Sequence, residues 1–156
     1  MRIALIATFC TLFSGQAALA ADPACLGTAS QVRLVIAVEN VKSRGGTIMV
    51  TVYPDDPERF LKRGGPVRGL SGLAVPADTP VTHVCVWLPE AGRYGISIYH
   101  DANTNRRFDQ NFLGLPVEGF GFSNNPTTLV GPPGFSAAAF QAAKGETAIP
   151  IRLRYL

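Results

Sequence analysis

The sequence predicts an all-β domain built as a two-sheet β-sandwich. Several short segments alternate apolar with polar residues, turn residues separate these segments, and almost no stretch has the periodicity of a helix. Short strands of this kind bury one face each, and two sheets packed face to face satisfy all of them. We therefore expect an Ig-like or transthyretin-like sandwich with one or two short helices.

Four alternating segments define the expected strands in the first two thirds of the chain. Residues 32–38 and 47–53 alternate, and the turn-rich residues 40–46 between them predict a hairpin. Residues 81–88 and 93–99 alternate as well, and Pro89 to Gly92 predict a second hairpin.

The remaining elements are expected to be short. Asp56 as a cap and Pro57 at the first helical position predict a brief helix over residues 58–63. Residues 64–80 are expected to be a loop, and the Ala-rich residues 135–143 to form a second helix. A final strand over residues 149–155 should turn its arginines outward.

The first 20 residues have the organisation of a secretory signal peptide. Arg2 supplies the positive charge, residues 3–13 are mostly apolar, and the segment ends in Ala18, Leu19 and Ala20. The apolar run is about half of the roughly 20 residues that a membrane span needs, so no transmembrane segment is expected. We expect cleavage near Ala20, a single domain over residues 21–156, and a periplasmic or secreted protein.

Charge and cysteine content narrow the class further. The chain has a net charge of +3, of which Arg2 is lost with the signal peptide, so nothing indicates a nucleic-acid partner. Cleavage also removes Cys10, and the two remaining cysteines, Cys25 and Cys85, form an even pair in an oxidising compartment. The sequence predicts a disulfide between them; two buried thiols that never meet are the alternative.

A loop after the predicted strand at residues 93–99 has the spacing of a calcium loop. Positions 1, 3, 5, 7 and 9 of such a loop supply oxygen ligands, position 7 through its backbone carbonyl. Here these positions are Asp101, Asn103, Asn105, Arg107 and Asp109. We expect calcium as the one cofactor of this chain, bound weakly.

The same loop departs from the calcium pattern at two positions. Position 6, usually Gly, is Arg106, and position 12, usually Glu, is Phe112. Glu118 can swing back to supply the missing carboxylate. In the alternative interpretation, the Asp and Asn side chains hydrogen-bond their own backbone in successive Asx-turns and bind no metal. Of the aromatic residues that follow, Phe112, Phe120 and Phe122 are expected to fold back over the core.

Catalysis has little support in this sequence. His100, Asp101 and Glu118 would make a metal-dependent hydrolase if they met in one pocket. Adjacent strand residues point to opposite faces, so a histidine that braces the following loop is the better interpretation of His100. His83 and His100 do not have the spacing of a metal-binding motif, and Ser123 does not lie in a nucleophile elbow. We expect no catalytic residues.

The most basic local patch is formed by Arg59, Lys62, Arg63 and Arg68. It would suit an anion or the envelope surface, but no phosphate-binding spacing accompanies it, so a solvated loop is the simpler interpretation.

Four stretches in order, residues 99–105, 112–116, 118–125 and 131–135, resemble the bacterial family called domain of unknown function 2141. The family pattern runs His-Asp-x-Asn-x-Asn-Gly, then Asp, then Gly-x-Pro-x-Glu-x-x-Gly-Phe-Ser-Asn, then Pro-Pro-x-Phe. The resemblance implies an exported β-sandwich with no established activity. The family often has Gly where this chain has Arg106, and a positive φ there would strain a non-glycine residue.

These observations together predict an exported, non-catalytic binding or structural domain with a weak calcium site in the loop 101–109. The anion- or envelope-binding protein is the alternative, and the metal-dependent hydrolase is less favoured. Its partner would be a protein or an envelope component that the sequence does not identify.

Overall fold

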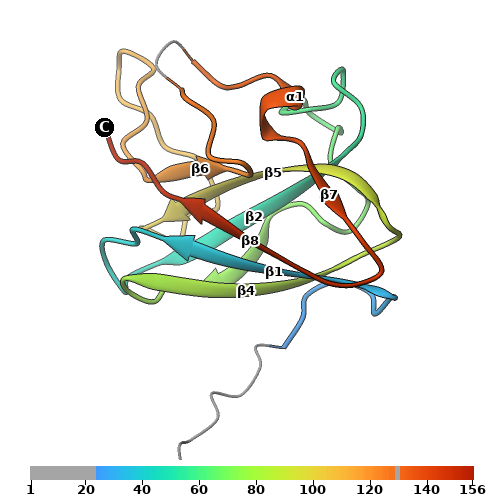
Figure 1. The fold of residues 1–156 in the computed structure, drawn as a ribbon. Coiled ribbons are helices and arrows are strands. Elements are labelled where there is room, and N and C mark those ends of the chain that lie inside the picture. Colours follow the sequence, from blue (N-terminus) through green and yellow to red (C-terminus); the bar gives the residue numbers. More distant parts are fainter. Residues whose placement is uncertain (1–23, 129–130) are drawn as a thin grey trace, which may run out of the picture.

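The structure, a computed structural model, describes residues 24–128 and 131–156 (Figure 1). In that part of the chain eight strands and one short helix follow one another. They are β1 (Val32–Glu39), β2 (Thr47–Pro54), β3 (Leu73–Pro76), β4 (Val81–Leu88), β5 (Gly92–Asp101), β6 (Phe120–Phe122), α1 (Phe135–Ala138), β7 (Phe140–Ala142) and β8 (Gly145–Arg152). The expected signal peptide, residues 1–20, lies outside the described residues.

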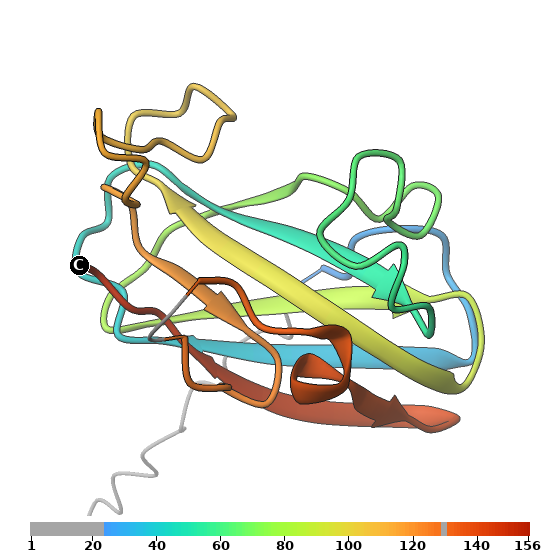
Figure 2. The same ribbon diagram turned by 90° about the horizontal axis from the view of Figure 1, so that it is seen from above.

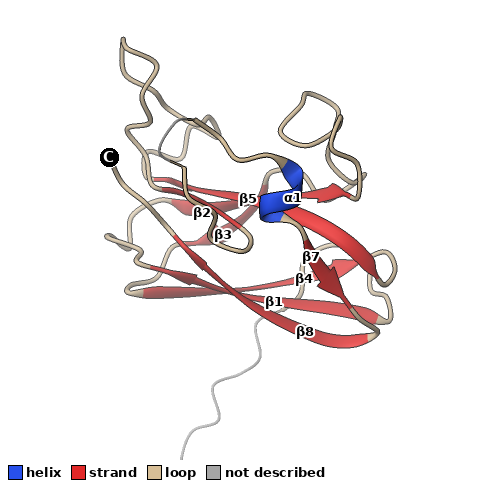
Figure 3. Cartoon of the chain, turned by 45° about the horizontal axis from the view of Figure 1, so that its top comes forward, coloured by secondary structure: helices blue, strands red, loops and turns tan. Residues whose placement is uncertain are grey.

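The strands form two sheets that pack as the two layers of a sandwich (Figure 3). The first sheet has the order β4-β1-β8, with β1 antiparallel to β4 and parallel to β8. The second has the order β3-β2-β5-β6, and β7 pairs with β5 beyond the end of β6. The predicted all-β sandwich is therefore confirmed.

The core lies between the two sheets because each strand turns one face inward. In β1 the alternate residues Val32, Leu34, Ile36 and Val38 are at most 1% exposed. β2 and β5 contribute Ile48, Val50, Val52, Ile96 and Ile98 from the other sheet. A second, smaller cluster of Tyr53, Phe60, Phe135 and Ala138 covers part of the outer face of the five-stranded sheet.

Both predicted hairpins are wrong. β1 and β2 belong to different sheets, and so do β4 and β5, because β1 pairs with β4 while β2 pairs with β5. The connection at residues 40–46 buries Val41 as it passes from one sheet to the other. The alternation of a strand shows which face it buries, whereas its neighbour is decided by long-range packing.

The helix predictions also need correction. Residues 57–61 form turns rather than a helix, because Leu61 has a φ of 57° and Phe60 is drawn into the outer aromatic cluster. Asp56 does accept the N–H of Glu58, at 3.0 Å. The predicted helix 135–143 shrinks to α1, since Phe140 and Ala142 pair with β5. Tertiary pairing here outweighs the helix propensity of alanine. The expected loop at 64–80 contains β3, and the final strand begins earlier than predicted.

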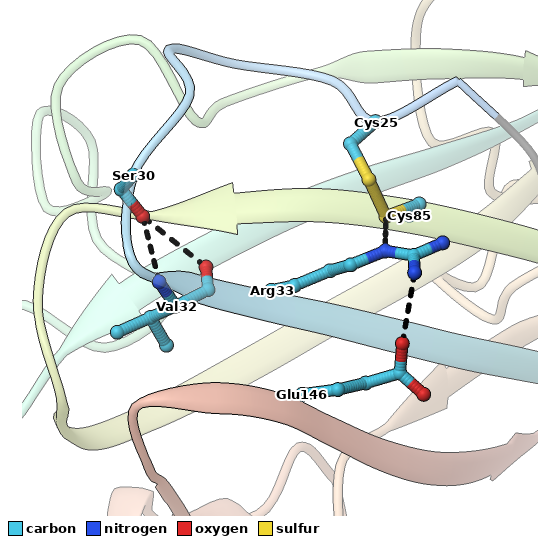
Figure 4. Close-up of a disulfide and its surroundings, with 6 residues drawn as sticks. All are labelled: Cys25, Ser30, Val32, Arg33, Cys85 and Glu146. Atoms are coloured by element: carbon cyan, nitrogen blue, oxygen red, sulfur yellow. Dashed lines mark hydrogen bonds and ion pairs between the residues drawn. A yellow bond between two sulfur atoms is a disulfide. The ribbon is translucent and has the colours of Figure 1, made fainter.

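The predicted disulfide between Cys25 and Cys85 is present (Figure 4). It holds the first described residues against β4, where Leu26 donates its N–H to the Cys85 carbonyl at 2.8 Å and accepts that of Trp87 at 2.9 Å. Arg33 lies beside it, with Nε 3.2 Å from the Cys85 sulfur and Nη1 2.9 Å from the Glu146 carboxylate. Among the described residues, no helix is long and apolar enough to cross a membrane.

Candidate functional site

The end of β5 fixes the first residue of the candidate site. Asp101 pairs with Thr47 of β2, and its carboxylate is fully buried. Gly46 makes this close approach possible, because a Cβ at its φ of 81° would lie 2.1 Å from the Asp101 carbonyl oxygen. The Asp101 carboxylate accepts the N–H groups of Asn105, at 3.1 Å, and Arg106, at 2.8 Å. These charge-assisted bonds fold the loop tightly around Asp101.

The two asparagines of the predicted loop are held in successive Asx-turns. The Asn103 side-chain oxygen accepts the N–H of Asn105 at 3.1 Å, and that of Asn105 accepts the N–H of Arg107 at 2.7 Å. Both side-chain amides donate to the same oxygen of Asp109, at 2.7 and 2.8 Å. The side chains of this loop therefore organise its backbone, as the Asx-turn interpretation predicts. The Arg107 side chain is exposed.

Glu118 closes the loop from further along the chain. Its carboxylate is 6% exposed and accepts the N–H groups of Ala102, at 3.2 Å, and Asp109, at 3.1 Å. Each carboxylate oxygen thus ties one end of the loop 102–109 to the base of the sheet. One connected network of hydrogen bonds joins the side chains that the sequence assigns to the predicted calcium site: Asp101, Asn103, Asn105, Asp109 and Glu118.

The three carboxylates of this network have no basic partner among the described residues. In the described part of the chain, the ion pairs join Arg33, Arg44 and Arg93 to other acids. The pKa of Tyr99 is raised, first by burial and then by the negative charges of Asp101, Glu118 and Asp109. Within residues 24–128 and 131–156, however, no three His, Cys, Asp or Glu side chains are arranged to hold a metal ion.

His100 lies on the opposite, inward face of β5 and is 2% exposed. Its Nε2 is 2.7 Å from the Gly45 carbonyl, which can only accept, so Nε2 carries the proton and Nδ1 accepts from the Tyr155 hydroxyl at 3.0 Å. Burial raises the pKa of Tyr155, and the N–H of Lys42 lowers it. His100 thus braces three segments. Among the described residues, the His100 ring makes no hydrogen bond to Asp101 or Glu118.

Gly119 is needed where the C-terminal segment crosses this end of the sandwich. A Cβ at this position would lie 2.3 Å from the Tyr155 ring. Next to it, Phe120 and Arg154 exchange backbone hydrogen bonds of 2.9 and 2.8 Å and join the two sheets. The segment 101–118 therefore stands on a base to which β5, β6 and the C-terminal residues all contribute.

An aromatic groove lies beside this base, on the outer face of the five-stranded sheet. Two adjoining hollows of about 490 and 330 Å³ share Phe108, Gln110, Phe120, Phe122 and Pro132. Tyr99 lines the first, and Leu115 and Leu156 line the second. Phe120 and Phe122, which the sequence predicts to cover the core, are half-buried but line this groove on the outer face of the sheet instead.

Phe112 does not cover the core as predicted, because its side chain is 95% exposed. Three neighbours are exposed with it: Leu113 at 67%, Val117 at 61% and Leu115 at 48%. Sequence reasoning missed this surface. The available signal was the mixture of these apolar residues with Asn111, Gly114 and Pro116, which is typical of a turn rather than of a buried segment.

The predicted basic patch lies at the surface, in the connection between β2 and β3. Arg59, Lys62, Arg63 and Arg68 are exposed, and Arg59 donates to the Pro66 carbonyl at 3.1 Å. Arg68 alone lines a small hollow of about 180 Å³, together with Trp87 and Pro89. His83 is exposed on β4, in the other sheet from His100.

A family model described as an uncharacterized protein conserved in bacteria (DUF2141) matches residues 36–150. The match spans most of both sheets and the whole segment 101–118, and it confirms the resemblance found in the sequence. Comparisons with curated proteins and with solved structures give no match.

Proposed function

The chain belongs to the bacterial family DUF2141, whose description names no activity, and we propose that it is an exported, non-catalytic binding domain. Its contact surface is the segment 101–118 and the aromatic groove beside it. The partner is an envelope component or a protein.

The observation that carries this proposal is the inverted polarity of the segment. Its acidic side chains, Asp101 and Glu118, are buried, whereas Phe112, Leu113 and Val117 stand in solvent. A folded chain does not gain stability by exposing neighbouring large apolar side chains, and such patches mark interaction surfaces. The buried hydrogen bonds supply the stability that lets the loop carry them.

Export is supported by the cysteine pairing and by the leader-like residues 1–20. A disulfide such as that of Cys25 and Cys85 persists in an oxidising compartment. The proposed lack of catalysis is supported by the hydrogen bonds that already engage the candidate catalytic side chains, His100, Asp101 and Glu118. His100 has both ring nitrogens in hydrogen bonds, and Asp101 and Glu118 accept backbone N–H groups.

The test combines processing with envelope binding. The full chain is expressed in a bacterium, and the intact mass of the exported product is measured; we expect it to begin near Ala21. The purified product is then sedimented with isolated envelope fragments. We expect the protein to sediment with them and the double variant Phe112→Ser, Leu113→Ser to lose most of this binding at an unchanged melting temperature. Retention of the full mass, or equal binding by the variant, contradicts the proposal.

Calcium binding by this segment is a separate proposal, supported by the calcium-loop spacing of Asp101, Asn103, Asn105 and Asp109 and by the lack of an ion-pair partner for Asp101, Asp109 and Glu118 among the described residues. Because the described carboxylates are not arranged to hold an ion, binding requires their side chains to reorient. Two loop carboxylates and one from Glu118 place the dissociation constant at the weak extracellular end, about 10⁻⁴ to 10⁻³ M. At ten times that concentration, calcium would stabilise the fold by about 1.4 kcal/mol.

This second proposal is tested by thermal unfolding of residues 21–156 in millimolar calcium and in chelator, for the protein itself and for Asp101→Asn. We expect calcium to raise the melting temperature of the protein and to leave that of Asp101→Asn unchanged. An equal melting temperature in calcium and chelator rules out the ion without affecting the binding proposal.

The anion-binding alternative has less support. Of its four residues, Arg59 is engaged with the Pro66 carbonyl and Arg68 alone lines a hollow. Arginine and lysine side chains that point into solvent from one loop are typical of a solvated surface.

A further inference from the structure

The exposed apolar residues stand on a hydrogen-bonded turn, which we call the apolar loop (residues 109–117). At its tip the Asn111 side-chain oxygen accepts the N–H groups of Leu113 and Leu115, at 2.9 and 3.0 Å. The backbone of Asn111 bonds to Leu115 at 2.8 Å and to Gly114 at 2.9 Å. Nearer the base of the loop, Gln110 and Pro116 form an isolated antiparallel β-bridge, and the N–H of Val117 donates to the Asp109 carbonyl at 3.1 Å. The apolar side chains are therefore presented by a fixed backbone.

The apolar loop projects away from the body of the sandwich. Figure 2 shows the gold segment that follows the yellow strand β5 extending past the end of that strand. Its tip carries Phe112 and Leu113, the two most exposed of the loop's large apolar side chains. A projecting tip inserts into a partner, in contrast to a groove, which receives one.

Next to the apolar loop, the basic side chains are exposed and the acidic side chains are turned inward. Arg106 and Arg107, which precede it, have exposed side chains. The acids of the same segment are turned inward: Asp101 and Glu118 are buried, and Asp109 accepts both asparagine amides. The exposed side chains of this segment are thus apolar at the tip of the apolar loop and cationic in the turn that precedes it. Such a surface complements an apolar layer covered by negative charge.

A lipid bilayer with anionic headgroups has that order of layers. Phenylalanine and leucine side chains favour the boundary between headgroups and acyl chains, and arginines favour the phosphates above it. A protein partner would instead need a pocket deep enough for the tip and a separate acidic rim. The bilayer accounts for both features of the surface at once.

We propose that the apolar loop inserts Phe112 and Leu113 into the surface of an anionic phospholipid bilayer while Arg106 and Arg107 contact the headgroup phosphates. The inference rests on the proposed function, because it names the envelope component that the segment binds. It describes peripheral attachment to one leaflet.

The test is flotation of the oxidised mature protein, residues 21–156, with vesicles of phosphatidylglycerol and phosphatidylethanolamine or of phosphatidylcholine alone. We expect binding to the anionic vesicles, weakened by salt, and little binding to phosphatidylcholine. The double variant Phe112→Ser, Leu113→Ser should bind at least about tenfold more weakly, since it loses the burial of two apolar side chains. In Phe112→Trp, the fluorescence added to that of Trp87 should shift to the blue on binding.

A matched pair of variants separates local contact from net charge. Arg106→Gln with Arg107→Gln and Lys62→Gln with Arg63→Gln remove the same charge, all from exposed positions. We expect the first pair to weaken vesicle binding and the second to leave it nearly unchanged. Equal losses would mean attraction by overall charge and would overturn the proposal.

Other outcomes separate this inference from the proposed function. If the protein sediments with envelope fragments but does not bind vesicles, and lipid extraction leaves the sedimentation intact, the lipid inference fails and the binding domain stands. The same holds if sedimentation velocity shows a dimer that Phe112→Ser abolishes, because the loop would then contact a second copy. If neither envelope fragments nor vesicles are bound, both proposals fail.

Discussion

Arg106 has a backbone conformation that suits glycine. Its φ of 60° places it in the left-handed region, where the Cβ of an L-residue is crowded. The conformation persists because the N–H of Arg106 donates to the buried Asp101 carboxylate at 2.8 Å. The calcium-loop pattern has Gly at this position because the sharp turn there needs a backbone conformation of this kind.

We therefore expect Arg106→Gly to stabilise the protein by about 1 kcal/mol, the relief of left-handed strain less the added entropy of glycine in the unfolded chain. Urea unfolding monitored by the fluorescence of Trp87 measures the change. The matched control is Arg107→Gly, at a neighbouring exposed position without a positive φ, where the substitution should destabilise. A loss of stability in both variants would show that the side chain of Arg106 matters more than its backbone.

At the scale of the element, Glu118 closes the loop 102–109 as a single carboxylate with two bonds. Gln in its place can accept one N–H but presents an amide donor to the other. The free energy of unfolding of Glu118→Gln should fall by about 1–3 kcal/mol, because a partly buried N–H, of Ala102 or Asp109, loses its charged acceptor.

Hydrogen exchange at Ala102 and Asp109 provides the second measurement, and the amide that loses its acceptor in Glu118→Gln should exchange faster. The control is Glu146→Gln, which breaks an exposed ion pair with Arg33 and should cost at most about 0.5 kcal/mol. Comparable losses in the two variants would contradict a specific role of Glu118 in the loop.

The strands and the polar network were the parts of this molecule that the sequence could predict. Alternation over residues 32–38 and 81–88 reports local burial, so β1 and β4 fall where expected. Asp and Asn act on backbone groups a few residues away, so a network around Asp101 is also encoded locally.

Strand pairing and loop exposure were not predictable in the same way. The pairing of β1 with β8 joins residues more than 100 positions apart, and no local pattern reports it. Phe112 reads as a core residue because an exposed and a buried phenylalanine look identical in a sequence. Its position in solvent follows from the turn around Asn111, which Asn111, Gly114 and Pro116 indicate in the sequence but the aromatic residue itself does not.

For the whole molecule, the disulfide decides how firmly the first described residues stay on the sandwich. Cys25 and Cys85 are separated by 60 positions, and the chain between them includes β1, β2 and β3. The core of β1, β4 and β8 does not depend on this link, because Val32, Leu34 and Ile36 are buried by the opposite sheet. The link acts chiefly by limiting the unfolded chain.

We expect Cys25→Ala with Cys85→Ala to remain folded and to lose up to about 4 kcal/mol of unfolding free energy, the loop-closure entropy of a link over this separation. Guanidinium unfolding of the oxidised protein, the reduced protein and the double variant measures the effect. The reduced protein and the double variant should agree, since neither has the link. If reduction leaves the midpoint unchanged, the link contributes nothing to stability. If the double variant has a much lower free energy of unfolding than the reduced protein, the buried Cys85 side chain and its contact with Arg33 are responsible instead.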